Sequence, residues 1–430
     1  MKKRLALCCL LIASMVTPVM AVAAREDEMS LRQMITQKLM IDFASWSSTD
    51  PGTAEEAGNI PPFTRMTDDV AEILARIQPG SVILFRNNLP STQEAVKLVD
   101  DMQSAVVSSG APAMLVATDQ EGGRITRLVQ GTSLPGNLAI GASGSEDNAR
   151  KSGEIIGSEL NALGINMVCA PDADVFSNPL NPIINTRSFG CDPKEVSRLS
   201  IAMLEGFKNT GTVAAAKHFP GHGDTATDSH TSLPIVDRDI DSVRALELVP
   251  FQALIDAGVD VIMTAHIQYP ALDDTRVKSE LNGEMIYLPA TLSRRILTDL
   301  LRDEMGFEGV IMTDALNMDA VAEHFGVEEA LIMTFEAGAD IATMPVRLTS
   351  PKDVERLESA VSAVEKAVED GRLDIEDIKE SCSRILALKE KYGVMNTRIG
   401  NVDEKTRVAR EVVANGEHRN ASSFSSPQIH

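Results

Sequence analysis

One segment of the chain concentrates side chains that can carry a proton or hold a metal ion. Residues 217–230 contain one Lys, two Asp and three of the seven His residues: Lys217, His218, His222, Asp224, Asp228 and His230. A Pro and two Gly in the same stretch indicate a loop rather than a helix. These residue types suit two chemistries, ligation of a metal ion or acid–base catalysis near neutral pH.

The two chemistries depend on different members of this segment. A metal ion could be wrapped by three side chains of ligand type: His218, His222 and Asp224. Lys217 counts against that interpretation, because a neighbouring ammonium group opposes cation binding. Acid–base chemistry would use His230, since the carboxylate of Asp228 two residues earlier can orient and charge the imidazole. A polar loop that only satisfies its own hydrogen bonds is the third alternative.

The elements that must position this loop follow from the apolar pattern. Short runs rich in Val, Ile, Met and Ala are typical of parallel strands covered on both faces. Eight strands are expected, at 38–43, 81–85, 113–118, 166–170, 213–217, 259–264, 309–313 and 339–343. Helical patterns lie between them, at 68–77, 92–107, 147–163, 193–208, 244–256 and 292–305. Eight strands alternating with helices predict an α/β fold, the (β/α)8 TIM barrel.

A doubly wound sheet is the alternative fold, but it usually carries a Gly-rich phosphate loop after its first strand. Residues 42–45 read Asp-Phe-Ala-Ser and do not match that loop. We expect extra C-terminal helices at 351–369 and 375–391 on the outside of the barrel. The barrel domain would then span 30–395. For the polar, Ser-rich tail 396–430 we expect a short helix near 404–414 followed by disorder.

Polar side chains follow several of the predicted strands. The third to seventh strands are followed by Asp119–Arg124, by Asp172 and Asp174, by Lys217 and His218, by His266, and by Asp314. A single Asp after a strand is most often a helix cap. Five such positions in register are harder to explain that way, and barrel enzymes carry their chemistry on these loops. The pattern therefore predicts a functional rim at the carboxyl ends of the strands.

The N-terminus reads as a secretory signal. A basic start of Lys2, Lys3 and Arg4 precedes the apolar run 5–16 and a small-residue cleavage site at 21–23. We expect residues 1–24 to be a signal peptide and the mature protein to be periplasmic or secreted, without stable membrane insertion. An uncleaved anchor is the alternative, although the run is short for a span. The net charge of −22 argues against nucleic-acid partners.

Four motifs, in the same order along the chain, resemble one known family. Residues 217–230 resemble the Lys-His-Phe-Pro-Gly-His-Gly…Asp-Ser-His signature of glycoside hydrolase family 3, in its β-N-acetylglucosaminidase branch. The other matches are Asp119–Arg124, Asn185–Gly190 and Ile311–Leu316. The resemblance covers about residues 30–395 and implies the same TIM barrel.

The resemblance implies a role for each matching position. Asp314 would be the catalytic nucleophile, His230 the general acid/base, and Asp228 its dyad partner. Five residues would hold the terminal sugar: Asp119, Arg127, Arg187, Lys217 and His218. His222 and Asp224 would shape the loop. No metal and no organic cofactor is implied.

These roles agree with the chemistry of a retaining glycosidase, which needs a carboxylate to trap the sugar and a second group to protonate the leaving oxygen. A His in the second role departs from the common pair of carboxyls. An imidazole can still give and take a proton near neutral pH. The carboxylate of Asp228 should favour its charged form.

The expected activity is that of a retaining exo-β-N-acetylglucosaminidase acting on wall fragments or chitooligosaccharides. A β-N-acetylglucosaminide phosphorylase or another β-glycosidase of the family is the alternative within enzymes. A non-catalytic sugar-binding protein of the envelope and a metal-dependent hydrolase are alternatives of other kinds. Many members of the branch continue into a second α/β domain, and residues 410–419 resemble the start of the linker to it.

Overall fold

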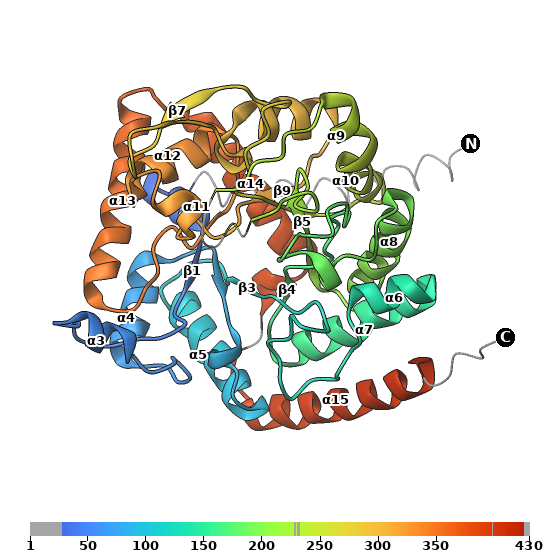
Figure 1. Cartoon of the computed structure of the whole chain (residues 1–430). Coiled ribbons are helices and arrows are strands. Elements are labelled where there is room, and N and C mark those ends of the chain that lie inside the picture. Colours follow the sequence, from blue (N-terminus) through green and yellow to red (C-terminus); the bar gives the residue numbers. More distant parts are fainter. Residues whose placement is uncertain (1–27, 228, 230–232, 398, 425–430) are drawn as a thin grey trace, which may run out of the picture.

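The computed structural model describes residues 28–424, apart from residues 228, 230–232 and 398. Eight short parallel strands form a ring in the order β10–β1–β2–β3–β4–β5–β6–β9 (Figure 1). A parallel bridge between Met312 and Ile341 joins the last strand of this order to the first. The predicted (β/α)8 barrel is therefore confirmed. Its strands are β1 (Leu39–Asp42), β2 (Ser81–Ile83), β3 (Leu115–Thr118), β4 (Met167–Val168), β5 (Val213–Phe219), β6 (Val261–Thr264), β9 (Val310–Met312) and β10 (Ala342–Thr343).

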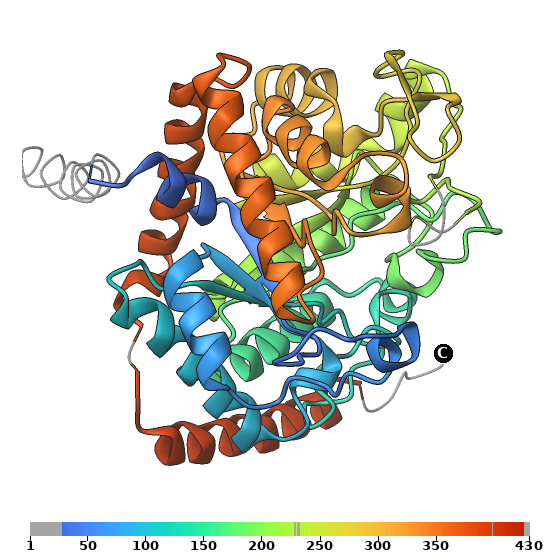
Figure 2. The same cartoon turned by 90° about the vertical axis from the view of Figure 1, so that its left-hand side faces the viewer.

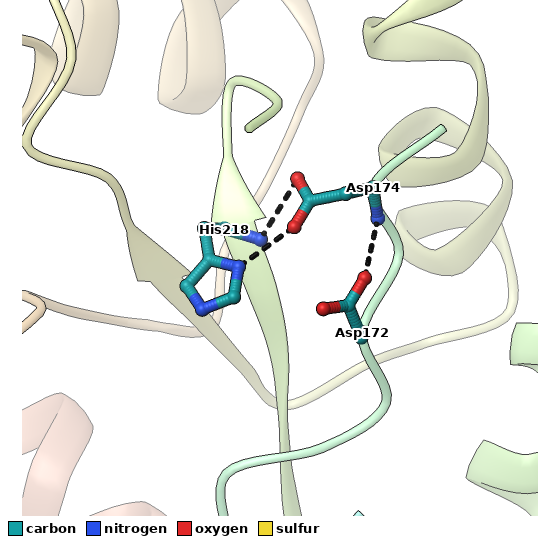
Figure 3. A group of neighbouring side chains, drawn as sticks. All are labelled: Asp172, Asp174 and His218. Atoms are coloured by element: carbon teal, nitrogen blue, oxygen red, sulfur yellow. Dashed lines mark hydrogen bonds and ion pairs between the residues drawn. The ribbon is translucent and has the colours of Figure 1, made fainter. Parts of the chain in front are cut away.

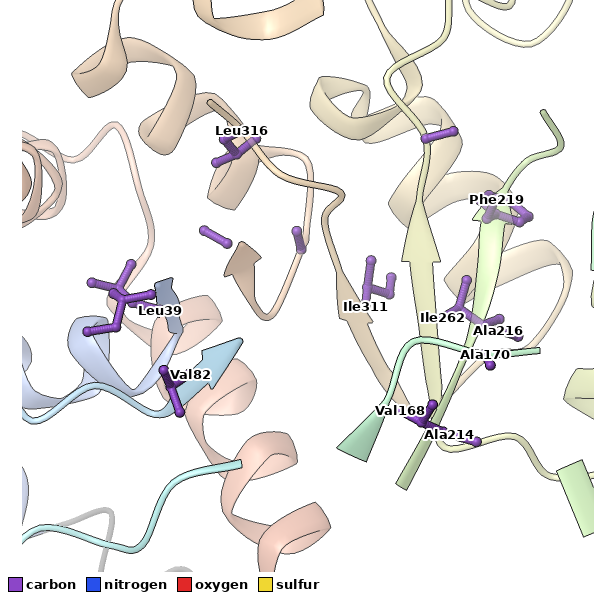
Figure 4. Close-up of a cluster of buried hydrophobic side chains, with 14 of the residues drawn as sticks. Leu39, Val82, Val168, Ala170, Ala214, Ala216, Phe219, Ile262, Ile311 and Leu316 are labelled. Atoms are coloured by element: carbon purple, nitrogen blue, oxygen red, sulfur yellow. The ribbon is translucent and has the colours of Figure 1, made fainter. Parts of the chain in front are cut away.

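Alternate residues of the strands face two different apolar layers, because successive side chains of a strand point to opposite sides. Met40, Leu115 and Met263 belong to the layer inside the barrel. Leu39 and Val116 belong to the layer between the strands and the surrounding helices, part of which is drawn in Figure 4. Both faces of every barrel strand are thus buried, which explains why the strands read as continuous apolar runs.

Helices surround the ring on all sides (Figures 1 and 2). The α-helices are α2 (Leu31–Gln37), α3 (Ala54–Gly58), α4 (Asp68–Ile77), α5 (Thr92–Ser108), α6 (Asn137–Ser143), α7 (Glu146–Ala162), α8 (Pro193–Asn209), α9 (Ile240–Leu246), α10 (Leu248–Asp256), α11 (Asp319–Ala322), α12 (Val327–Glu336), α13 (Pro351–Glu369), α14 (Ile375–Lys391) and α15 (Val402–Phe424). Residues Arg295–Glu304 form a π-helix. Within the described residues, no helix is both long and apolar enough to cross a membrane.

Three local features differ from the predictions. The predicted helix 244–256 is two helices that meet at Glu247, because Pro250 has no N–H to donate to the preceding turn. An antiparallel hairpin of β7 (Arg276–Lys278) and β8 (Met285–Tyr287) was not predicted. Helix α15 is longer than the predicted 404–414. Helix α13 contacts α12 and α2 as an outer helix, whereas α14 packs on both layers: Cys382 and Leu386 join the outer one, and Ile385 and Leu388 join the inner one.

Gly80, directly before β2, marks a close approach of two backbone segments. A Cβ added there would lie 1.8 Å from the carbonyl oxygen of Gln37. The Gly80 amide donates to the carbonyl of Thr36 at 2.9 Å, and its own carbonyl accepts from Leu115 at 3.0 Å. The entry into β2 therefore leaves no room for a side chain.

Gly80→Ala should accordingly lower the free energy of unfolding by about 1–3 kcal/mol, the usual cost of overpacking. Denaturant unfolding measures this loss. The control is Gly58→Ala, since an added Cβ at Gly58 would meet nothing within 4 Å. Equal stability of the two variants would contradict the close approach.

Candidate active site

A cavity of about 320 Å³ opens at the carboxyl ends of the strands. Its lining residues come from the loops after β3, β4 and β5, from β5 and β6 themselves, and from the end of β9: Asp119, Glu121, Arg124, Ile125, Arg127, Ile183, Arg187, Lys217, His218, His222, Ser229, Met263 and Asp314. The structure thus brings together six residues that the sequence predicted for the site: Asp119, Arg127, Arg187, Lys217, His218 and Asp314. The other two, Asp228 and His230, lie outside the described residues.

Glu121 forms the centre of a buried charge network in this cavity. Lys217, the fifth residue of β5, places its Nζ 2.7 Å from both Glu121 Oε1 and Asp119 Oδ1. Arg187 donates from Nε and Nη2 to the two oxygens of Glu121, at 2.9 and 2.8 Å. Burial alone would raise the pKa of Glu121, but the charges of Arg187 and Lys217 outweigh it and hold that pKa well below its ordinary value. Two cations are therefore fixed by one carboxylate.

His218 is oriented from both sides of its ring. Its Nδ1 lies 2.7 Å from Asp174 Oδ2 (Figure 3). On the other side of the ring, its Nε2 lies 3.3 Å from Arg187 Nη2. A guanidinium can only donate, so Nε2 accepts and the ring proton resides on Nδ1, where it is donated to Asp174. Asp174 also accepts from the His222 amide at 2.6 Å. Despite its burial, the pKa of Asp174 is lowered, chiefly by the neighbouring His218 and the hydrogen bond from its ring.

Asp172, Asp174 and His218 offer ligand atoms that lie within 4.8 Å of one another, a spacing that could hold a metal ion. The surrounding charges oppose a cation, because Arg187 Nε lies 3.7 Å from Asp172 Oδ2. Burial and the neighbouring charge of Asp174 raise the pKa of Asp172 well above its ordinary value, so this carboxyl favours a proton. The donor set therefore fits a protonated hydrogen-bond network better than a divalent ion.

The alternative metal set of His218, His222 and Asp224 is not assembled. The two oxygens of Asp224 accept from Nε and Nη2 of Arg238 instead. His222 lies within hydrogen-bond distance of Thr225 Oγ1, at 2.8 Å, and of Ser229 Oγ, at 3.1 Å.

His222 and Asp224 thus shape the loop after β5, as the resemblance implied. Burial, followed by the neighbouring His218, lowers the pKa of His222 to about 4, so the His222 ring is neutral at physiological pH. Ser229 is the residue between Asp228 and His230. The contact between Ser229 and His222 therefore anchors the loop at the residue that separates the two predicted catalytic residues in the sequence.

Asp314 enters the cavity from the end of β9. Its amide donates to the carbonyl of Thr264 at 3.2 Å, and its Oδ1 accepts from the Ala315 amide at 2.7 Å. His266, another residue of the predicted rim, contacts this turn. Its Nε2 contacts the Ala315 carbonyl and its Nδ1 contacts Thr291 Oγ1, both at 2.9 Å. His266 is fully buried and positions the turn without lining the cavity.

Two residues near the site carry roles that the sequence analysis missed. Glu121 stands inside the quoted Asp119–Arg124 motif, which was the available signal. Glu247 had no sequence signal, since it sits where α9 and α10 meet. Its carboxyl is buried, and neither oxygen has a hydrogen-bond partner among the described residues. A Cβ added at Gly221 would lie 2.7 Å from Glu247 Oε2, so this carboxyl packs directly against the loop after β5.

Glu247 should lower the stability of the folded state as the pH rises from the mildly acidic range to about 8. Burial, and then the negative charges of Asp174 and Asp224, raise the pKa of Glu247 to about 8. A carboxyl whose pKa is raised on folding contributes stability below its unfolded pKa, and that contribution is lost as the pH rises toward and through 8.

Wild type should therefore lose stability relative to Glu247→Gln between about pH 5 and pH 9, because the amide cannot ionise. Thermal midpoints of both proteins across this range measure the difference. A constant difference at all pH values would show that Glu247 does not titrate in this window.

The fold and the cavity together define a class of protein. A TIM barrel carries its chemistry at the carboxyl ends of its strands. Here that end presents fixed cations and carboxylates suited to the hydroxyl groups of a sugar, together with a carboxylate that follows a separate strand. This is the arrangement of a glycosidase.

The comparison with known families identifies the family within this class. Residues 30–388 match the N-terminal domain of glycosyl hydrolase family 3. The chain belongs to this family, as its motifs predicted.

Several known proteins are similar to this chain over most of its length. A β-hexosaminidase A of Pseudoalteromonas piscicida is 40% identical over 418 residues, covering 93% of this chain and 69% of the relative. A family 3 β-N-acetylglucosaminidase of Paenibacillus sp. str. FPU-7 superposes with a TM-score of 0.75 at 36% identity, covering 89% of this chain and 68% of the other. A β-N-acetylhexosaminidase of Beutenbergia cavernae gives a TM-score of 0.69 at 27% identity, covering 84% of this chain and 99% of the other.

Proposed function

We propose that this chain is a retaining exo-β-N-acetylglucosaminidase that removes terminal, non-reducing β-linked GlcNAc. The family match and the similar proteins support the general part of this proposal, β-N-acetylhexosaminidase activity. One structural observation supports the specific part, the retaining removal of a terminal sugar. Asp314 lines the same cavity as the cluster of Asp119, Arg187, Lys217 and His218.

The floor of this cavity supports action at a chain end. Lys217 and Glu121 are almost completely buried, and they lie beneath Asp119, which stays partly exposed. A terminal sugar could direct its hydroxyl groups at Asp119 and at the donors of Arg187 and Lys217. Charge-assisted hydrogen bonds of this kind are stronger than neutral ones.

The proposed reaction has two steps. Asp314 attacks the anomeric carbon and forms a glycosyl ester, while His230 donates a proton to the departing oxygen. His230 then removes a proton from water, which cleaves the ester and releases the sugar with its original configuration. The Asp228 carboxylate would favour the imidazolium form needed in the first step.

Asp314→Asn tests the nucleophile. The amide keeps the size of the side chain but cannot form the glycosyl–enzyme bond, so turnover of an aryl β-GlcNAc should fall by orders of magnitude with little change in stability. Asp319→Asn, the same substitution five residues later in α11, is the control. More than about a tenth of wild-type turnover in Asp314→Asn would assign the nucleophile elsewhere.

His230→Ala tests the acid/base. A dinitrophenolate leaves without a proton, so the variant should slow natural-type glycosides far more than this activated substrate. With the activated substrate, the intermediate on Asp314 should accumulate and give a burst followed by slow turnover. Asp228→Ala should behave similarly but more mildly. An equal loss with every substrate would mean that His230 only positions the loop or the sugar.

The natural substrates would be wall fragments or chitooligosaccharides, met after export. This part of the proposal rests on the signal-like residues 1–24. The mature protein recovered outside the cytoplasm should begin close to residue 24 or 25, which N-terminal sequencing determines. An intact Met1 on soluble cytoplasmic protein would contradict export.

A further inference from the structure

The last helix, α15, touches the loop that carries several cavity residues, although it lies beyond the family match that ends at residue 388. In Figures 1 and 2 this helix runs along the edge of the barrel, beside α5 and α7. The connection between β3 and α6, residues 119–136, is called the β3 loop below. Five of its residues line the cavity: Asp119, Glu121, Arg124, Ile125 and Arg127.

The first half of α15 is anchored on α5. Lys405 forms an ion pair with Asp100, and the amide of Gly400 donates to both oxygens of the same carboxylate, at 3.0 and 2.9 Å. Thr406 and Ala409 are buried. These contacts fix where the rest of the helix must run.

The second half of α15 lies directly against the β3 loop. A Cβ added at Gly416 would come within 2.5 Å of Thr132 Oγ1 and 2.7 Å of Glu159 Oε1. One turn later, Asn420 Nδ2 donates to the carbonyl of Ser133 at 2.9 Å. The glycine thus allows the helix backbone to approach the loop as closely as possible.

The β3 loop connects this contact to the cavity over a few residues. On its outer side, the Thr132 amide lies 3.1 Å from both oxygens of Glu159, which projects from α7. On its inner side, Gln120 Oε1 accepts from the amides of Arg127 and Leu128, at 2.7 and 3.1 Å. Only four residues separate Arg127, which faces the cavity, from Thr132, which faces α15. A shift of the outer side would therefore move the inner side.

We propose that the second half of α15 is a positioning element for substrate binding, which holds the β3 loop and its Arg124 and Arg127 in place through Gly416 and Asn420. Neither residue of α15 touches substrate. The segment acts only through Thr132 and Ser133. That the ligand is a sugar rests on the proposed function. That α15 restrains the β3 loop is independent of the proposed function.

Gly416→Val tests the proposal, because its branched side chain must push α15 away from Thr132. The expected result with an aryl β-GlcNAc is a KM raised about three- to tenfold, with kcat changed less than twofold. That pattern means that binding is lost while the chemical step is kept. Gly416→Ala and Asn420→Ala should give smaller increases. Ala414→Val adds the same β-branched side chain at an exposed position of the helix and should leave KM unchanged.

A chain ended after Asn401 provides the second variant, in case Gly416→Val does not fold. It should show the same rise in KM. Amide hydrogen exchange of residues 120–136 gives a readout that needs no turnover, and exchange should speed up in both variants but not in Ala414→Val. If the wild type turns over no aryl β-GlcNAc, the proposed function fails and hydrogen exchange alone decides this inference. Unchanged exchange, or a loss of kcat without a rise in KM, would overturn it.

Discussion

The site depends on one constraint, the burial of two cations beside a carboxylate that they share. Arg187 and Lys217 are brought together by the loop after β4 and by β5, and Glu121 from the loop after β3 lies between them. Removing one member of a buried ion pair leaves an uncompensated charge and is strongly destabilising. The loops after β3 and β4 and strand β5 must therefore keep their relative positions, which makes the cavity that they line rigid.

The other side chains of the cavity take their orientation from that network. Arg187 also contacts His218 Nε2, so it settles the tautomer of a ring whose other side is bound by Asp174. Asp119 is held by Lys217 and keeps an exposed side toward the cavity. Asp314 stands apart in the loop after β9, supported by His266 through the Ala315 carbonyl. Fixed polar groups and a separately held carboxylate are what glycoside chemistry requires.

Much of the fold could be predicted, because a strand buried on both faces must be apolar throughout, and all eight such runs became barrel strands. The β7–β8 hairpin, half exposed, lacked that signal. Motif resemblance identified Asp314 and Lys217, but no spacing shows that Lys217 meets Glu121, 96 residues earlier. Glu247 and the length of α15 are set by packing against distant segments, which local patterns do not encode.

The central claim is that Glu121 and the cations beside it form one energetic unit. A double-mutant cycle of Glu121→Gln and Arg187→Met, followed by denaturant unfolding, tests it most directly. Each single substitution should cost about 3–5 kcal/mol, because it leaves a buried charge unpaired. The double variant should lose clearly less than the sum, by about 1 kcal/mol or more. Losses that add to within about 0.5 kcal/mol would contradict the account, because independent sites behave in that way.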